Sequence, residues 1–243
     1  MATYVALVNQ LLTRLNEVTL ATTGSGFTDV RNVQALAKQA VNNSIRNILQ
    51  TGQEWPFLKT TYTQTLTAGT RLYSFPADFA TVDWDTFYIK SLGAVSNTPS
   101  FLPVISFEEY TQAYRGLDDQ GDSGSGISAP QRVYQTYESK FGVTPVPNNS
   151  YEIEYVYWTF PADLTAYDDV AVIPDRFNHV IIDGAMMYMM RFRSNDQSAA
   201  LHQQSLQEGI RSMRRILMDD PLDIRSTVIQ RNKSFSNTMS SIV

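Results

Sequence analysis

Residues 141–192 constrain the fold more than any other part of the sequence. Within them, positions 151–158 alternate aromatic or aliphatic residues with glutamates, which is typical of a half-buried β-strand. Pro174 then stands at a first helical position with Asp175 after it, and both favour the start of a helix. The following positions are apolar around most of the helical circumference, so this helix is expected to be buried on several sides. No catalytic or nucleotide-binding motif lies in this stretch.

Helical patterns flank the β-like part of the chain on both sides. Apolar residues recur at helical spacing over residues 3–19, with Thr3 as a candidate N-cap, and again over residues 30–50. A last helix is expected over residues 197–218, where an aspartate pair and a proline end the pattern. The remaining residues are polar, weakly apolar and without a clear period, which indicates an extended arm or disorder.

Residues 55–158 have the alternation and turn residues of β structure. Two short strands are expected around the Ala68-Gly69 turn, and a short helix with Ser106 as its cap. Residues 116–130 are rich in glycine, serine and aspartate and are predicted to form a flexible loop. Further strands are predicted over residues 86–90, 131–137, 139–144 and 151–158.

These patterns predict an α+β fold. We expect an antiparallel bundle of four main helices, an inserted β-rich, sandwich-like lobe and an extended C-terminal arm. The expected boundaries are 1–54 and 170–220 for the helical body, 55–169 for the β lobe and 221–243 for the arm.

Composition restricts the function. Hydrophobic residues make up 43% of the chain and charged residues 18%, which is the balance of a globular protein. The net charge of −5 argues against a protein that wraps and holds nucleic acid, but it is compatible with DNA that only passes by. The absence of cysteine excludes disulfides and thiolate metal sites. No signal peptide or membrane-spanning run is recognisable, so no membrane partner is expected.

Candidate catalytic groups are few. His179 lies between Asp175 and Asp183 at helical spacing, and we favour a solvated or interface histidine over a metal ligand. Adjacent acids are expected to be solvated rather than to act as a hydrolytic pair, which needs two carboxyls on opposite sides of a sugar. The aromatic residues around Trp55 and in 155–158 are expected to be core. We therefore predict no enzyme activity, no metal and no cofactor. The acid pairs are Glu108-Glu109, Asp118-Asp119, Asp168-Asp169 and Asp219-Asp220.

The order of several segments resembles the head-to-tail adaptor, or connector, proteins of short-tailed bacteriophages, including the tail accessory factors. The likeness covers roughly residues 1–220 and rests on order and spacing. The segments are Trp55-Pro56-Phe57, the strands around the Ala68-Gly69 turn, residues 75–79, residues 141–147 followed by strand 151–158, and Ile173-Pro174-Asp175.

The resemblance implies a homo-oligomeric ring, commonly a dodecamer, bound beneath the portal protein. Such a ring continues the channel through which double-stranded DNA passes without sequence-specific binding, and it presents a docking surface for tail nozzle, tube or fibre proteins. It implies a virion component at the portal vertex, assembled in the cytoplasm of the host bacterium. Three alternatives stay open: another tail ring protein (tail tube or tail completion), a peptidoglycan hydrolase, and a monomeric carbohydrate-binding lobe.

The resemblance also gives the candidate contact residues. The C-terminal segment of such proteins can reach onto the portal, and the helical body is expected to carry the ring contacts. A cyclic ring needs two different faces on each subunit. The expected portal contacts are Leu222, Ile224, Arg225, Val228, Ile229, Arg231 and Phe235. The expected subunit contacts are Met186, Met189, Met190, Arg211, Arg214 and Arg215. The alternatives are that the methionines pack between helices of one subunit and that the arginines form a solvated helix face.

Overall fold

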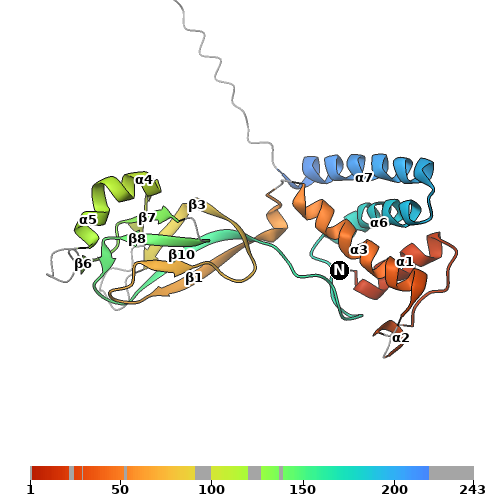
Figure 1. Cartoon of the computed structure of the whole chain (residues 1–243), viewed down its shortest axis with the longest axis horizontal. Helices are drawn as coiled ribbons and strands as arrows, with labels where there is room; N and C mark the ends of the chain where they lie inside the picture. The colour runs from red at the N-terminus through yellow and green to blue at the C-terminus, as the bar shows by residue number, and fades with distance from the viewer. Residues whose placement is uncertain are drawn as a thin grey trace, which may run out of the picture.

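The chain folds into two lobes joined by a narrow waist, as Figure 1 shows for the computed structural model. One lobe is made of helices from both ends of the sequence, and the other is made of the strands between them. The mixed α and β character expected from the sequence is thus confirmed. The structure describes residues 2–21, 25–28, 30–51, 54–90, 100–119, 127–136 and 139–218.

The helical body has one apolar core, to which its four longest helices contribute. The longest of them, α7, packs mainly against α6 and forms the outer layer of the body (Figure 1). The short α2 lies at the opposite side. An antiparallel four-helix bundle in the strict sense stays a prediction. The helices of the body are α1 (Tyr4–Arg14), α2 (Ser25–Thr28), α3 (Asn32–Gln50), the 3-10 turn η4 (Asp175–Phe177), α6 (Asn178–Phe192) and α7 (Asp196–Leu217).

The first helix is shorter than its apolar spacing predicts. It ends at Arg14, because Asn16 adopts a left-handed backbone with φ of 56°. Val18, expected on the buried stripe, is 78% exposed. The expected cap Thr3 forms no side-chain cap hydrogen bond. Periodicity alone could not show that a left-handed residue interrupts it.

The β lobe consists mainly of two four-stranded sheets that share one core. The first has the order β1-β10-β3-β4, with antiparallel neighbours throughout, and the second has the order β2-β8-β7-β5. Aromatic rings fill the space between the two sheets. The ring centroid of Phe141 on β8 lies 5.5 Å from those of Phe87 on β3 and Tyr155 on β10. The strands are β1 (Lys59–Leu66), β2 (Leu72–Ser74), β3 (Phe79–Lys90), β4 (Ser100–Phe101), β5 (Val104–Ile105), β6 (Ile127–Ser128), β7 (Arg132–Gln135), β8 (Lys140–Thr144), β9 (Val146–Pro147) and β10 (Tyr151–Thr159).

A short helical run covers the second sheet (Figure 1). Ser106 caps it as expected, because its Oγ accepts a hydrogen bond from the Glu109 amide at 3.1 Å. The run is longer than the sequence suggests and includes a π-helical turn. It comprises α4 (Phe107–Glu109), η2 (Tyr110–Tyr114) and α5 (Arg115–Asp118).

The waist is apolar rather than a free hinge. Trp55 is fully buried, its indole Nε1 donates to the Ile48 carbonyl at 3.2 Å, and the 3-10 turn η1 (Pro56–Leu58) follows it. Trp158, near the end of β10, belongs to the core of the helical body together with Leu58. The expectation that these aromatics are core is confirmed. Burying them at the junction couples the orientation of the two lobes.

After β10 the chain returns along the helical body, not along the sheets. The Asn42 side chain of α3 donates to the Leu164 carbonyl at 3.0 Å, and Arg46 forms an ion pair with Asp163. Ala171 and Ile173 are buried in the body's core. Residues 163–173 therefore contact the helices, although the sequence places residues up to 169 in the β lobe.

Candidate functional site and interaction surfaces

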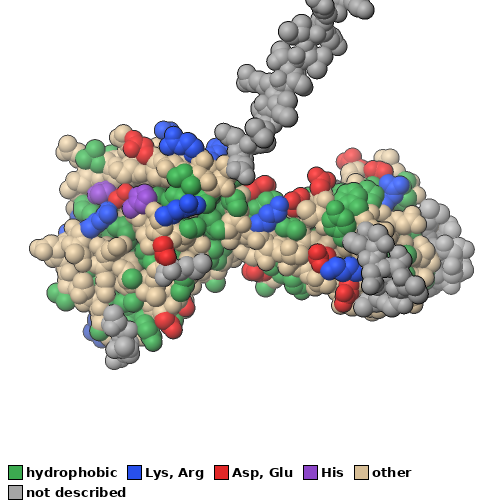
Figure 2. Space-filling view, turned by 180° about the vertical axis from the view of Figure 1, so that it is seen from behind, with side chains coloured by type: hydrophobic (Ala, Val, Ile, Leu, Met, Phe, Trp, Pro, Cys, Tyr) green, Lys and Arg blue, Asp and Glu red, His purple; other side chains and the backbone are tan. Residues whose placement is uncertain are grey.

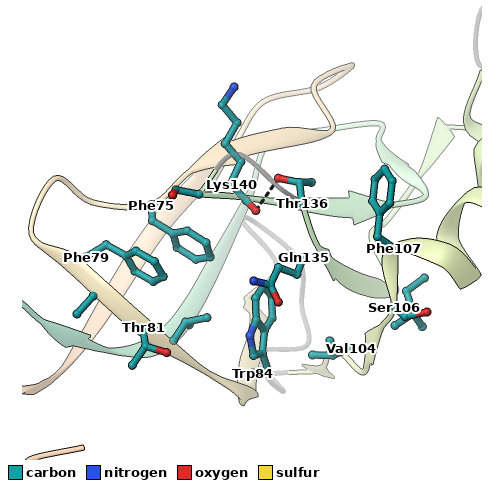
Figure 3. A pocket seen from close by; sticks show the side chains of 14 residues that line it. Phe75, Phe79, Thr81, Trp84, Val104, Ser106, Phe107, Gln135, Thr136 and Lys140 are labelled. Atoms are coloured by element: carbon teal, nitrogen blue, oxygen red, sulfur yellow. Dashed lines mark hydrogen bonds between the residues drawn. The ribbon is translucent and has the colours of Figure 1, made fainter. Parts of the chain in front are cut away.

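A groove lies in the β lobe, where the two sheets separate. It has a volume of about 680 Å³ and lies between the start of β3 and the edge formed by β5 and the β7–β8 turn (Figure 3). Phe75 and Phe79 stack on one side with 4.1 Å between ring centroids, and Lys140 lies next to Phe75. Phe107 lies on the opposite side. None of the described lining residues is an Asp, Glu or His. Such a groove offers stacking and apolar contact, and Lys140 is the titratable side chain among its described lining residues.

The acid pair Asp118-Asp119 corrects one expectation. Asp118 is only 7% exposed, and its Oδ1 accepts a hydrogen bond from the Thr144 hydroxyl at 3.2 Å. Burial raises the pKa of Asp118. Asp119 is turned to Arg71, with 2.8 Å between carboxylate and guanidinium. Asp118 is thus not solvated, because the helical run packs it onto the second sheet.

Asp118 belongs to a polar cluster that holds the helical run in place. Tyr110 of the run stacks on Tyr134 of β7 with 3.8 Å between ring centroids, and the Arg71 guanidinium donates to the Tyr110 hydroxyl at 3.3 Å. Burial also raises the pKa of both tyrosines. The two carboxylates of the pair serve this packing separately, which does not resemble the facing carboxyls of a glycosidase.

The position of Asp118 predicts a pH-dependent stability. A folded-state pKa above the unfolded one means that the neutral acid favours folding, and that this contribution is lost as the pH rises through the folded pKa. We expect Asp118→Asn, which keeps the shape and stays neutral, to have a higher free energy of unfolding than the wild type at pH 7. The difference should vanish below about pH 4. Denaturant unfolding at a series of pH values measures it, and a pH-independent difference would contradict it.

The expected subunit-contact residues fall into two groups in the structure. Met186 and Met189 are 4% and 1% exposed and pack within the subunit's own core, and Met190 is half-buried against it. All three arginines, at positions 211, 214 and 215, are exposed on α7. The arginine side chains are therefore accessible on the surface, whereas Met186 and Met189 pack inside the body. That these residues contact a neighbouring subunit stays a prediction.

The histidine that the sequence places among acids has no metal site around it in the described part of the chain. Asp183 is paired with Arg14, with 2.8 Å between Oδ1 and the guanidinium, and His179 is exposed. No group of three or more metal-binding side chains occurs among the described residues. Arg14 of α1 forms an ion pair with the carboxylate of Asp183 on α6, and the spacing of residues in the sequence could not reveal this contact.

Comparison with known families gives the identity of the fold. A family model described as SU10 adaptor protein matches residues 2–230. The chain belongs to the SU10 adaptor protein family. No curated protein matches the sequence. The resemblance to phage head-to-tail adaptors is thereby confirmed at the level of the family.

Membership of this family makes the protein a phage adaptor and a component of the virion. The family is a structural one. The match spans both lobes, so the helical body and the β lobe are parts of one adaptor unit. In the described part of this SU10 adaptor, no helix has both the length and the apolar character that crossing a bilayer requires.

The expected portal contacts of this SU10 adaptor lie outside the described residues. The residues concerned, from Leu222 to Phe235, follow α7 in the sequence, and the described part of the chain ends at Met218. The family match extends through residue 230 and thus includes the first part of this segment. Its role stays a prediction.

Proposed function

We propose that this SU10 adaptor forms a ring beneath the portal, extends the DNA channel and presents the docking surface for the tail. The observation that carries this proposal is the family match over residues 2–230. The two-lobed shape supports it, because a subunit with separate lobes can meet the portal with one and the tail with the other (Figure 1). We assign ring and portal contacts to the helical body and the C-terminal segment, and the tail contact to the β lobe.

The charge of the chain supports the passage of DNA. A net charge of −5 repels phosphate rather than holding it, so a ring of such subunits lets DNA move through. Binding of the ring to its partners then depends on surface complementarity and involves no turnover.

A nonsense mutation in the encoding phage tests the proposal. We expect heads that contain portal and DNA but no tail, seen by electron microscopy of lysates. Complementation with the wild-type chain should restore tailed particles. Tails attached to heads without this protein would refute the proposal. A pull-down with this protein that retrieves tail nozzle or fibre proteins, but never the portal protein, would instead indicate another kind of tail ring protein.

Deleting residues 222–243 tests the role assigned to the C-terminal segment. We expect weaker portal binding, because the removed segment carries the proposed portal contacts. The body should keep its thermal unfolding temperature, because the described residues before 219 already form an apolar core. Binding to purified portal and a thermal melt measure the two effects. Unchanged portal affinity would contradict the assignment.

A further inference from the structure

A turn in the chain after β10 is held rigid by its own residues. The carboxylate of Asp169 accepts hydrogen bonds from the amides of Thr165 at 2.6 Å and Ala166 at 2.7 Å. These bonds lower the pKa of Asp169, so the turn stays closed at neutral pH. Its carbonyls in turn accept from the first amides of α1, which lack a side-chain cap: Tyr4 donates to Asp169 at 2.7 Å and Val5 to Tyr167 at 3.1 Å. The turn is therefore fixed to the body.

The tip of this turn presents an unusual surface. Tyr167 is 40% and Val170 43% exposed, and Asp168 lies exposed between them. Asp168 forms no ion pair with any described residue, whereas Asp163 nearby is paired with Arg46. A rigid, acidic and aromatic tip of this kind loses little conformational entropy when it binds.

The outer face of α7 has the opposite charge. Its exposed arginines at 211, 214 and 215 form no ion pair within the described part of the chain. The same helix exposes two apolar side chains, Leu201 at 63% and Ile216 at 54%. In Figure 2 basic side chains gather along the upper edge of the helical body, where α7 lies.

The two surfaces lie on opposite edges of the body and cannot meet within one subunit. Figure 1 shows α7 along the upper edge and the chain that follows β10 along the lower one. We propose that the arginine face of α7 in one copy binds the turn 165–170 of the next copy, an inference that rests on the proposed ring. Two different faces placed this way form a head-to-tail contact, which closes into a ring when the rotation between copies allows it.

The chemistry of the two surfaces fits this pairing. An arginine can bind the Asp168 carboxylate with two parallel hydrogen bonds and can stack on the Tyr167 ring. Leu201 or Ile216 can cover Val170 at the margin of the contact. DNA in the channel is the competing occupant of the arginine face, and the turn would then have no role.

Cysteine cross-linking tests the contact directly, because the chain has no cysteine of its own. Ala166→Cys places a thiol on the turn and Ser212→Cys one beside Arg211, and each keeps the charges. In particles assembled with the double variant, a short bismaleimide should give a ladder of multimers on a denaturing gel. Each single variant should give none, because like positions do not meet in a head-to-tail contact. Double-variant particles that contain the adaptor but give no ladder would overturn this contact alone, whereas wild-type particles without the adaptor would overturn the proposed ring function.

Charge reversal provides the second test. We expect Arg211→Glu with Arg215→Glu, and separately Asp168→Lys, each to reduce the adaptor content of particles on the order of tenfold. Co-expression of the two variants should restore it, since each reversed face then meets its complement on the other variant. Glu208→Gln on the same helix is the matched control and should change nothing. Unchanged adaptor content in the arginine variant, with weakened DNA retention, would assign the arginine face to DNA and overturn the proposal.

Discussion

Gly142→Ala is expected to destabilise the β lobe by about 3 kcal/mol, the upper end of the usual cost of overpacking a core. A Cβ at this position of β8 would lie 2.1 Å from Cζ and 2.4 Å from the hydroxyl of Tyr134. Tyr134 is 1% exposed and stacks on Tyr110, so its ring cannot move aside. The strand or the helical run above it must shift instead.

Hydrogen exchange measures this effect lobe by lobe. Amides of β7 and β8 should lose protection, whereas those of α3 and α6 keep it, because the two lobes have separate cores. Gly116→Ala is the matched control, since no described atom other than those of its own helix backbone and chain neighbours lies within 4 Å of its Cβ position. Adding Tyr134→Leu should recover part of the loss. Wild-type protection in Gly142→Ala would contradict the close approach of strand and ring.

Gly184→Ala is expected to have a comparable effect on the helical body, about 2–3 kcal/mol. The added Cβ would lie 2.2 Å from the Ser44 Oγ and 3.2 Å from a methyl carbon of Leu206. Ser44 is fully buried, and its hydroxyl donates to the Ile181 carbonyl at 2.7 Å. The substitution therefore separates α3 from α6 and breaks a buried hydrogen bond.

Thermal unfolding and particle assembly measure this second prediction. The melting temperature should fall and the adaptor content of particles should fall with it, because the body carries the proposed ring contacts. Ser44→Gly with Gly184→Ala should recover part of the stability, since it removes the clashing atoms. A stable Gly184→Ala variant would show that α3 and α6 approach each other less closely.

Local patterns predicted most of the elements. The strand from Tyr151 to Thr159 and the helix α7 follow their alternation and periodicity closely, and Pro174 stands just before the helical turn that leads into α6. Such elements are readable because the period of the buried side chains is written in the sequence itself. The cap Ser106 and the turn at Gly69, with φ of 76°, were predictable for the same local reason.

The candidate surfaces were less predictable. Exposed arginines on α7 follow from periodicity, but the sequence could not show that Met186 and Met189 face inward, since methionine suits both a core and an adaptable interface. It also could not show that Asp118 is buried, because the helical run that contains Asp118 packs it against Thr144, which is distant in sequence. The turn 165–170 gave no signal beyond its acids.

The order of the main helices and strands, the absence of cysteine and the resemblance that the family match confirms could all be read from the sequence. These properties depend on neighbouring residues and on composition. By contrast, the folded structure was needed to show that the chain after β10 packs on the helical body. The same holds for the acidic turn and the basic helix face, which lie on opposite edges of the body. Contacts between residues far apart in the sequence, such as that of Asn42 with Leu164, hold this segment against the helices. The local spacing of apolar residues carries no information about such contacts.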